Sequence, residues 1–542
     1  MFRCIVITFN LLFLLSSQNF TYDDEDWYVL SAPSSINAIS EDNFFVYFAS
    51  NNGIYKYDKI LDDIKLDNSF FINIENPQIS HFYYDKYHDM YWIAHREGIS
   101  YKSSIESIWR DLPNLNFNIN NYFEIQEIGS SPKYFWVKYG DNLYPFSPYS
   151  SLPIKHEDAM EELNYIYWGH SYQGVKQNDL DFSSYIIEGD WEIGFRGAHH
   201  KDGRSFNVNI IMVDDSGNKW FGTDSGYILK GWRNSTRLEI INLGLAFNNI
   251  TEAYYDNLGN WWFANSRMKQ LGQLPNYNNI YQFDSVPFIN KWYEEENKWT
   301  YYMSSESPLI QSNDINCILQ IGSIIYFGTT RGLLYLDLYN DEWNLIDDSD
   351  GLNDEIILDI LEFQESIIVL TNKGINEISI INHIIIPNKS YELNTLKKHN
   401  IFDIEANANN LYIASDIGLL KFNWDQNNLV IISQKKLKKI SIVDNNILGS
   451  DGTLWKIDNL NFDELISHNV DNYVACDHFI WMINDSQIEL LNSVTNHSWQ
   501  YTAKDGIPGN IIYDVNCNDE WVWFLTNNGV AFYNWGKYHK IR

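Results

Sequence analysis

The sequence reads Trp220-Phe221-Gly222-Thr223-Asp224-Ser225-Gly226-Tyr227 at one point and Tyr326-Phe327-Gly328-Thr329-Thr330-Arg331-Gly332-Leu333 at another. Each copy has two bulky apolar residues, a small residue, a short polar run, and then glycine followed by a bulky apolar residue. Looser copies recur, and the first positions of the twelve units are residues 47, 91, 135, 167, 220, 262, 326, 369, 412, 447, 481 and 523. A period of about forty residues is typical of one four-stranded β-propeller blade.

Each unit also shows the order of its strands. The alternating segment Asn510 to Val515 precedes the last copy and predicts an innermost strand that is buried on both sides. The repeated phrase predicts the second strand, and its glycine, often preceded by Asn or Ser, permits the tight hairpin to the third strand. A Trp followed by alternating residues, as at Trp343 and Trp499, predicts the outer fourth strand.

The number of units sets the expected domain organisation. Without a leader, about 520 residues remain, which is too many for one six- or seven-bladed ring at this period. We therefore predict an all-β protein with two tandem β-propellers of about six or seven four-stranded antiparallel blades each. The longest interval between units, from residue 262 to 326, places the first propeller at residues 21–290 and the second at 291–542.

The first residues predict export. Met1-Phe2-Arg3 is followed by an apolar run from Cys4 to Leu15 and a polar segment, which is the layout of a signal peptide over residues 1–20. The apolar run is too short to span a bilayer comfortably. We expect a soluble extracytoplasmic protein, periplasmic, on the cell surface or secreted, with no transmembrane anchor after signal removal.

Three cysteines remain after the leader, so they cannot all pair within one chain. Cys476 and Cys517 fall on successive inner-strand regions and could approach one another. We expect buried free thiols rather than a disulfide.

The net charge of −33 excludes one class of partner. Nucleic-acid binding needs clustered Lys and Arg, and an anionic membrane surface would repel this chain. The one basic cluster, Lys435-Lys436-Leu437-Lys438-Lys439, is expected to be a solvated strand or loop.

No catalytic motif is evident. The chain has no His-Glu-x-x-His, Gly-x-Ser-x-Gly, phosphate-binding glycine loop or Cys-x-x-Cys pattern. The segments Asp214 to Trp220 and Asp256 to Trp262 are predicted to be hairpin turns rather than calcium loops, since they lack a terminal bidentate carboxylate. We predict no metal site, no cofactor and no assigned catalytic residue.

The richest polar segment runs from residue 194 to 204. It is expected to be a loop that joins an outer strand to the next inner strand, and in propellers such loops gather around the axial channel. Its paired histidines and arginines could bind an anionic or sugar ligand or act as acid and base, although a solvated crossover loop is the simpler interpretation. With neighbouring aromatic positions, the candidate ligand-binding residues are Trp168, His170, Trp191, Arg196, His199, His200 and Arg204.

The repeat is similar to that of a known family. The segment Asp505 to Val530 resembles the two-component regulator propeller repeat, as do residues 350–374 and 208–227. In that family, tandem propellers form the extracytoplasmic ligand-binding part of hybrid sensor kinases, often for polysaccharide fragments. A similar two-propeller layout occurs in the surface propeller component of the type IX secretion system. The resemblance implies a standalone exported member.

These observations define the expected function. We expect an exported, non-catalytic binding or scaffolding module that recognises a saccharide or a protein partner. A propeller-type polysaccharide lyase or glycosidase using His199 and His200 is the first alternative. An accessory propeller of a secretion system or envelope is the second. The oligomeric state is not predicted.

Overall fold

The computed structural model describes residues 26–51, 53–66, 79–96, 98–106, 108–112, 125–171, 182–201, 204–266, 269, 289–303, 307–310, 314–386, 396–443, 446–458, 461–466, 469–484 and 487–540. About 57% of the described residues lie in strands and 5% in helices. Within the described residues, the strands form eleven antiparallel or largely antiparallel sheets, most of them four-stranded. The expected all-β propeller class is therefore confirmed. The predicted signal peptide, residues 1–20, lies outside the described residues.

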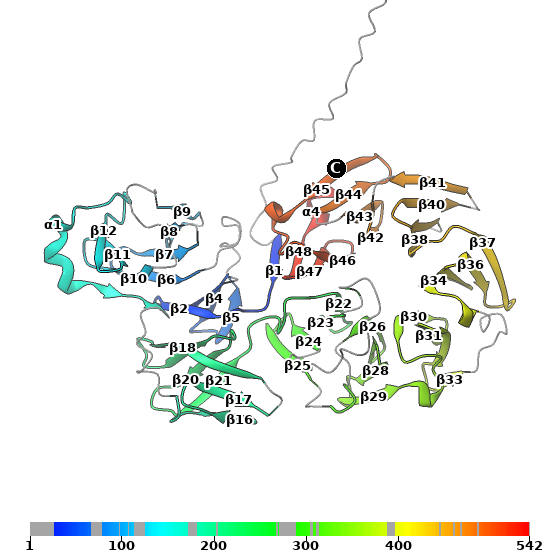
Figure 1. Ribbon diagram of the computed structural model, residues 1–542, viewed down its shortest axis with the longest axis horizontal. Helices are drawn as coiled ribbons and strands as arrows, with labels where there is room; N and C mark the ends of the chain where they lie inside the picture. Colours follow the sequence, from blue (N-terminus) through cyan, green and yellow to red (C-terminus); the bar gives the residue numbers. More distant parts are fainter. Residues whose placement is uncertain are drawn as a thin grey trace, which may run out of the picture.

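Seven four-stranded sheets surround one centre and form the part that we call the ring (Figure 1). Their strands are β22 (Glu252–Tyr255), β23 (Asn260–Ala264), β24 (Ile289–Tyr293) and β25 (Lys298–Tyr302); β26 (Ile315–Ile321), β27 (Ile324–Thr329), β28 (Gly332–Asp337) and β29 (Glu342–Ile346); β30 (Ile357–Phe363), β31 (Ser366–Thr371), β32 (Gly374–Ser379) and β33 (Ile385–Ile386); β34 (Ile401–Asn407), β35 (Asn410–Ser415), β36 (Gly418–Asn423) and β37 (Asn428–Ser433); β38 (Lys439–Val443), β39 (Asn446–Ser450), β40 (Leu454–Asp458) and β41 (Asn461–Ile466); β42 (Asn472–Cys476), β43 (Phe479–Asn484), β44 (Gln487–Asn492) and β45 (His497–Tyr501); and β46 (Ile512–Cys517), β47 (Val522–Thr526) and β48 (Gly529–Tyr533) with β1 (Trp27–Leu30).

The last blade of the ring is built from both ends of the described chain. Strand β1 pairs antiparallel with β48, with Trp27 opposite Tyr533 and Leu30 opposite Val530. The blade then packs on β22–β25, where the rings of Trp261 and Trp523 lie 5.0 Å apart. Because β1 covers the edge of β48, no backbone edge of that strand is left open.

This pairing changes the expected domain organisation. The sheets between β1 and β22 interrupt the ring in sequence, so the first part of the chain is inserted into the second rather than preceding it. The expected join between residues 290 and 291 lies inside β24, whose pairing with β23 and β25 holds both sides of it in one sheet.

The inserted part forms an arc of four sheets. Its strands are β2 (Ile36–Glu41), β3 (Phe45–Ser50), β4 (Gly53–Asp58) and β5 (Asp63–Leu66); β6 (His81–Asp85), β7 (Met90–His95), β8 (Gly98–Ser103) and β9 (Arg110–Asp111); β10 (Ile125–Ser130), β11 (Phe135–Tyr139) and β12 (Asn142–Phe146); and β18 (Ser205–Val213), β19 (Lys219–Thr223), β20 (Ile228–Gly231) and β21 (Arg237–Ile241). Apolar clusters join β18–β21 to β2–β5, then to β6–β9 and then to β10–β12.

Six or seven blades were expected in this part of the chain, whereas its described residues form four sheets. Short additional elements cover both ends of the arc. At one end, α1 (His156–Ala159) and η3 (Met160–Tyr165) follow β12, and α1 packs against it. At the other, β15 (Ile186–Ile187), β16 (Trp191–Ile193) and β17 (Gly197–His200) extend the β18–β21 sheet to seven strands. Phe182 packs on Phe221 at 5.5 Å between ring centroids and covers the face of that sheet. Terminal units of repeat proteins commonly need such covers.

The turns at Asp214 and Asp256 are hairpin turns, as predicted, and their carboxylates accept hydrogen bonds from nearby N–H groups of the protein. The indole Nε1 of Trp220 donates to Asp214 Oδ2 at 2.9 Å, and the backbone N–H of Asn218 donates to Asp214 Oδ1 at 2.7 Å. Asp256 accepts in the same way from Trp262 Nε1 at 2.8 Å. Each turn therefore fixes a buried Trp of the following strand.

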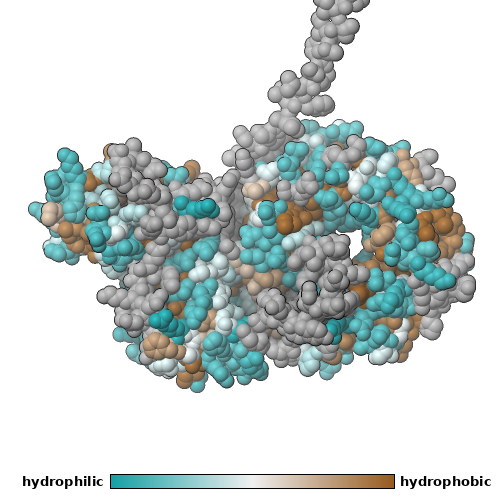
Figure 2. Space-filling view, viewed as in Figure 1, coloured by the Kyte–Doolittle hydropathy of each residue, from teal (hydrophilic) through white to brown (hydrophobic). Residues whose placement is uncertain are grey.

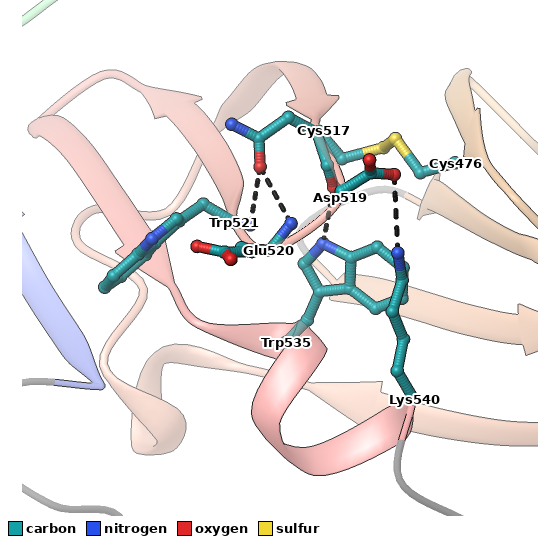
Figure 3. The surroundings of a disulfide bond; sticks show 8 residues. Cys476, Cys517, Asp519, Glu520, Trp521, Trp535 and Lys540 are labelled. Carbon is teal, nitrogen blue, oxygen red and sulfur yellow. Dashed lines mark hydrogen bonds and ion pairs between the residues drawn. A yellow bond between two sulfur atoms is a disulfide. The ribbon is translucent and has the colours of Figure 1, made fainter.

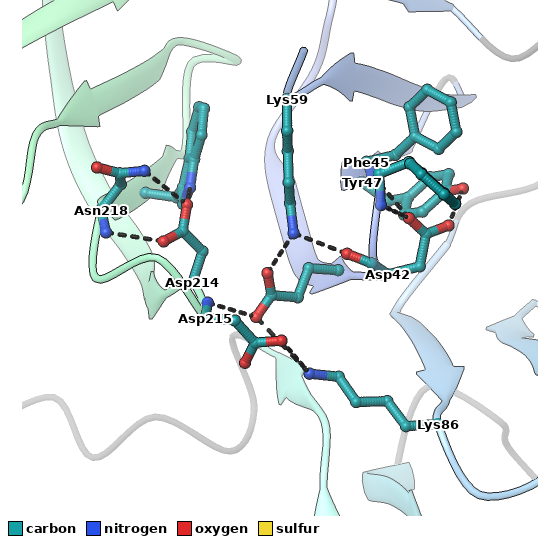
Figure 4. Close-up of polar contacts among 11 residues, drawn as sticks. Asp42, Phe45, Tyr47, Lys59, Lys86, Asp214, Asp215 and Asn218 are labelled. Carbon is teal, nitrogen blue, oxygen red and sulfur yellow. Dashed lines mark hydrogen bonds and ion pairs between the residues drawn. The ribbon is translucent and has the colours of Figure 1, made fainter.

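A polar network ties three sheets of the arc together (Figure 4). Lys59 Nζ lies 2.6 Å from Glu41 Oε2, and the other oxygen of Glu41 accepts the backbone N–H of Asp215 at 3.0 Å. Lys86 from the β6–β7 turn pairs with Asp215 at 2.9 Å. Because Glu41 is buried, these partners offset the cost of removing its charge from water.

Cys476 and Cys517 form a disulfide, so the expectation of free thiols was wrong (Figure 3). Cys476 ends β42 and Cys517 ends β46, the inner strands of two neighbouring blades. Those strands lie side by side, and the Cα atoms at their ends are 6.2 Å apart, within bridging distance. Cys317 is a buried free thiol, as expected.

Few helices occur. The remaining short segments are η7 (Asp348–Asp350), η8 (Leu396–Lys398), η9 (Ala503–Asp505) and α4 (Trp535–His539). Among the described residues, no helix is long and apolar enough to cross a membrane.

Candidate functional site

The predicted site residues fall into two separate groups. Trp168 lies in β13 (Tyr167–Trp168), which pairs with the inner strand β10, and His170 lies in β14 (His170–Ser171), which pairs with the inner strand β2. This short segment therefore crosses between two blades of the arc. Burial lowers the pKa of His170, so its imidazole is held neutral.

The second group lies in the β16–β17 hairpin at the end of the arc. Trp191 is opposite His200, and their rings are 5.0 Å apart. The guanidinium of Arg204 lies 5.5 Å from the Trp191 ring and its Nη2 lies 3.4 Å from His200 Nδ1. His199 is exposed and lies opposite Glu192.

The expectation that residues 194–204 form a crossover loop at an axial channel was wrong. Gly197–His200 is a strand that pairs with both β16 and β18, and Ala198 lies opposite Phe206, so that both side chains are buried in the apolar core of this sheet. Arg196 precedes this strand, and its carbonyl accepts the N–H of Val208 at 2.7 Å. The hairpin stacks an arginine, a histidine and a tryptophan, but it does so on an outer layer of the arc.

A different polar group lies on the innermost strands of the ring. It comprises Glu252 on β22, Asp359 on β30, Asp403 and Glu405 on β34, Lys439 on β38, Asn472 on β42, Asp514 on β46, and Lys269, and we call it the axial cluster. Most of these residues stand at the first to third position of their strand. Since neighbouring inner strands contact one another around the ring, these positions gather at one end of its axis.

Several members of the axial cluster bind one another. Lys439 Nζ donates to Asn472 Oδ1 at 2.6 Å, and Asn472 Nδ2 donates to Asp514 Oδ1 at 2.7 Å. The backbone N–H of Ile440 donates to Asp403 Oδ2 at 2.7 Å. These bonds link four neighbouring blades, so the cluster is a shared network rather than a set of isolated side chains.

Lys269 and Glu252 form the second part of the network. They are an ion pair, and the charge of Asp514 on the neighbouring blade also raises the pKa of Lys269 against the effect of burial. The two strands that meet where the ring closes, β22 and β46, therefore face the same space.

A register shift in the strand pairing lies beside each of three carboxylates. Asp359, Asp403 and Asp514 each follow a register shift in the pairing of their inner strand with the next strand. A β-bulge re-aims the side chain beside it, and bulges are frequent next to binding sites.

The cluster is enclosed by protein yet reached by water. The side chains of Lys269 and Lys439 are 37% and 35% exposed, whereas those of Glu252 and Asp514 are 12% and 11% exposed. Figure 2 shows a gap between the atoms near the centre of the ring. The lysine side chains are thus partly exposed, while the carboxylates remain largely covered.

Burial shifts the pKa values of the carboxyl groups in the axial cluster toward neutral pH. Burial raises the pKa of Asp359 to about 6 and, with the charge of Asp359, that of Glu405 to about 7. Burial also raises the pKa of Asp403, and it raises that of Glu252 to about 8 in spite of the nearby Lys269. Carboxyl groups near half-protonation can donate as well as accept hydrogen bonds, which suits a ligand with hydroxyl groups. Among the described residues, no group of three or more His, Cys, Asp and Glu side chains is placed to hold a metal ion.

The sequence carried a signal for this cluster that the repeat analysis missed. Asp359, Asp403 and Asp514 each lie fifteen residues before the hairpin glycine of their own unit, namely Gly374, Gly418 and Gly529. In the arc, the residues at that spacing are Ala38, Tyr83 and Ile211. Aligning the units on their glycines would have drawn attention to these three aspartates, although the ring unit with Gly332 has Cys317 at the same position.

Comparisons with known proteins find likeness in structure only. No protein-family model matches the chain, and no curated protein matches it in sequence. The chain is similar to the extracellular domains of two Bacteroides thetaiotaomicron proteins. For the one-component system BT4673, the identity is 12%, the TM-score is 0.42, and 92% of this chain and 70% of that one are covered. For the hybrid two-component system BT3049, the identity is 14%, the TM-score is 0.41, and the coverage is 93% and 68%.

A third similar structure is PorZ, a surface component of the type IX secretion system of Porphyromonas gingivalis. It shares 11% identity at a TM-score of 0.41, with 94% of this chain and 87% of that one covered. These likenesses concern the fold alone.

Proposed function

We propose that this chain is an extracytoplasmic binding module that recognises a saccharide at the axial cluster of the ring. The observation that carries this proposal is the mixed set of acceptors and donors at one end of the inner strands. Asp359, Asp403 and Glu405 supply acceptors, while Lys439 and Asn472 supply donors. Saccharide hydroxyls both donate and accept, so such a set complements them without a net charge on the ligand.

The disulfide supports the extracytoplasmic part of the proposal. Cys476–Cys517 joins two blades of the ring, and structural disulfides persist in oxidising compartments outside the cytoplasm. The predicted signal peptide over residues 1–20 points to the same compartment.

Catalysis is the second candidate, because two features of the cluster favour it. Glu405 has a pKa raised to about 7 and lies near Asp359, whose pKa is raised to about 6, as an acid and base pair of a glycosidase or lyase would require. The pair formed by His199 and His200 loses support as a catalytic group, because it lies in the β16–β17 hairpin. An accessory or scaffolding role in the envelope remains the third candidate.

A glycan panel tests the proposal. Purified protein is screened by thermal shift and by product analysis against neutral and acidic oligosaccharides. We expect at least one oligosaccharide to raise the melting temperature without product formation, and the shift to vanish in Asp359→Asn/Asp403→Asn. Glu365→Gln, on the exposed β30–β31 turn of the same blade, is the matched control and should keep the shift.

Two other outcomes would redirect the assignment. Product formation that disappears in Glu405→Gln would make the chain an enzyme. Binding that survives Asp359→Asn/Asp403→Asn but is lost in His199→Ala/His200→Ala would move the site to the β16–β17 hairpin.

A further inference from the structure

Four large apolar side chains stand in turns on two adjacent sheets of the arc. Phe44 lies in the β2–β3 turn, Ile60 and Leu61 lie in the β4–β5 turn, and Trp232 lies in the β20–β21 turn; they are 57%, 76%, 71% and 51% exposed. We call them the apolar tips. No other tryptophan in the described part of the chain is exposed to this extent, so Trp232 departs from the use of this residue in the core.

The four tips are neighbours. The backbone N–H of Lys59 donates to the carbonyl of Phe44 at 2.9 Å, which holds two turns of one sheet together. Lys230 Nζ lies 2.7 Å from Asp62 Oδ1 and 3.8 Å from the ring centroid of Trp232, which ties the β4–β5 turn to the next sheet. The tips therefore form one patch, and contiguous apolar patches mark contact sites on protein surfaces.

The two aliphatic tips are held outward by their own turn. Asp58 Oδ1 accepts the backbone N–H groups of Ile60 and Leu61 at 2.8 and 3.0 Å. The carboxylate thus fills the inside of the turn, and the two exposed side chains are left on its outer side. A partner finds this arrangement already formed, so binding needs little ordering of the turn.

Trp232 is also held at the surface. Lys230, which contacts its ring, is 3% exposed and lies 4.8 Å from the ring centroid of Tyr57 and 5.5 Å from that of Trp220. Those two rings belong to the apolar cluster that joins the sheets. Cation–π attraction therefore fixes the indole of Trp232 to a buried, ion-paired lysine, with about half of the tryptophan left in water.

The charges around the tips are nearly balanced. Arg233, directly after Trp232, is exposed and forms no ion pair with another described residue. The patch thus lacks the acidic excess that the net charge of −33 gives the chain as a whole. Arginine is suited to phosphate groups, and tryptophan concentrates at the headgroup level of bilayers. Three ion pairs lie beside the tips: Lys59–Glu41 (Figure 4), Lys65–Asp63 and Lys230–Asp62.

We propose that the apolar tips dock the arc onto the surface of a phospholipid bilayer. Ile60, Leu61 and Trp232 enter the boundary between headgroups and acyl chains, and Arg233 pairs with headgroup phosphates. Side chains at the tips of turns protrude, and a fluid lipid surface accepts them without a matching pocket. The bilayer is a zwitterionic one, because anionic lipids repel a chain with a net charge of −33. The patch is separate from the axial cluster, so this proposal stands whether or not a saccharide binds there.

Flotation with phosphatidylcholine vesicles tests the proposal on the full chain. We expect a fraction of the protein to float with the vesicles. Ile60→Asp/Leu61→Asp should lower the partition coefficient about tenfold or more, because carboxylates resist entry into the lipid boundary. Val494→Asp/Thr495→Asp, in the exposed β44–β45 turn of the ring, is the matched control, since it adds the same charge and should float like the wild type.

Fluorescence locates the contact. Trp232→Phe should remove most of the tryptophan emission that acrylamide quenches, because Trp232 is the exposed tryptophan of the described chain. Phosphatidylcholine vesicles should shield that emission in the wild type. Added phosphatidylglycerol should weaken the binding, and salt should restore it by screening the repulsion.

The proposal is overturned if the wild type does not float with phosphatidylcholine vesicles, or if Ile60→Asp/Leu61→Asp floats equally well. It is overturned as well if Trp232 stays open to acrylamide on the vesicles, because another surface then makes the contact. A dimer that sedimentation detects without lipid, and that the Ile60→Asp/Leu61→Asp variant converts to monomer, also overturns it, since the occupant of the patch is then a second copy of the chain.

Discussion

Replacing Trp27 with alanine should loosen the last blade of the ring. Trp27 is 8% exposed, and its ring centroid lies 4.7 Å from that of Tyr533, 6.1 Å from that of Phe524 and 6.4 Å from that of Tyr501. These contacts fasten β1 to the blade that carries the other end of the chain. Truncating a buried tryptophan costs about 3–5 kcal/mol through lost burial and the cavity left behind.

Amide hydrogen exchange measures this effect where it is expected. Since each 1.4 kcal/mol corresponds to a factor of ten, amides of β48 that exchange through opening of the blade should exchange about 100- to 4,000-fold faster in Trp27→Ala. The matched control is Trp343→Ala on the outer strand β29, where the ring packs on Phe327 at 5.7 Å. Its effect should remain within its own and the neighbouring blade.

Two results would refute this reasoning. Unchanged exchange in β48 of Trp27→Ala would mean that β1 does not hold the last blade. An equal loss of protection in β31 and β32, three blades away around the ring, would mean that the blade does not open as a separate unit.

Three further perturbations follow from the structure. Cys476→Ser/Cys517→Ser should lower the free energy of unfolding by about 4 kcal/mol, as expected for a crosslink over 41 residues. Reductant should lower the melting temperature of the wild type and leave that of the variant unchanged. Identical melting curves of the two proteins would contradict this. Asp256→Ala should lower the free energy of unfolding in urea by about 3 kcal/mol, because it leaves the buried Nε1 of Trp262 and the N–H of Asn260 without their acceptor. The control Glu365→Ala should lower it far less. Between pH 8 and 5, the native state should take up protons on Glu405 and Asp359 before the unfolded state does, because burial raises both pKa values above their ordinary range. Stability should therefore rise as pH falls through about 7 and 6, and this gain should shrink in Asp359→Asn/Glu405→Gln, whereas an unchanged pH slope would refute the assigned shifts.

The sequence predicted individual blades well because their signals are local. The hairpin glycines Gly332, Gly374, Gly418 and Gly529 all begin the third strand of a blade, with positive φ as expected. The turns at Asp214 and Asp256 also lie where the pattern placed them. Each of these features depends on a few consecutive residues, and tertiary contacts then reinforce the same choice.

The way the blades join was harder to predict, because it depends on residues far apart in the chain. Nothing near Trp27 indicates that its strand pairs with residues 530–533, since β1 is only four residues long. The disulfide was missed for a related reason. Cys476 and Cys517 meet only because two inner strands lie side by side and end at the same level of the ring.

The candidate ligand-binding residues were chosen by their chemical richness, and they stay a prediction beside the proposed axial cluster. The His199 and His200 segment combines reactive residue types, but it pairs with β18, where Ala198 lies opposite Phe206 in the apolar core of the sheet. The axial aspartates Asp359, Asp403 and Asp514 stand in three different units, so no one segment draws attention to them. Their shared spacing from the hairpin glycine becomes meaningful only when the units close into a ring.

Amide hydrogen exchange in the presence of a bound oligosaccharide tests the central claim most directly. The ligand is the oligosaccharide that most raises the melting temperature in the glycan panel. We predict slower exchange at the starts of the inner strands, at residues 252–255, 357–360, 401–405 and 512–515. Protection confined to residues 191–204, or a panel without any binder, would contradict recognition of a saccharide at the axial cluster.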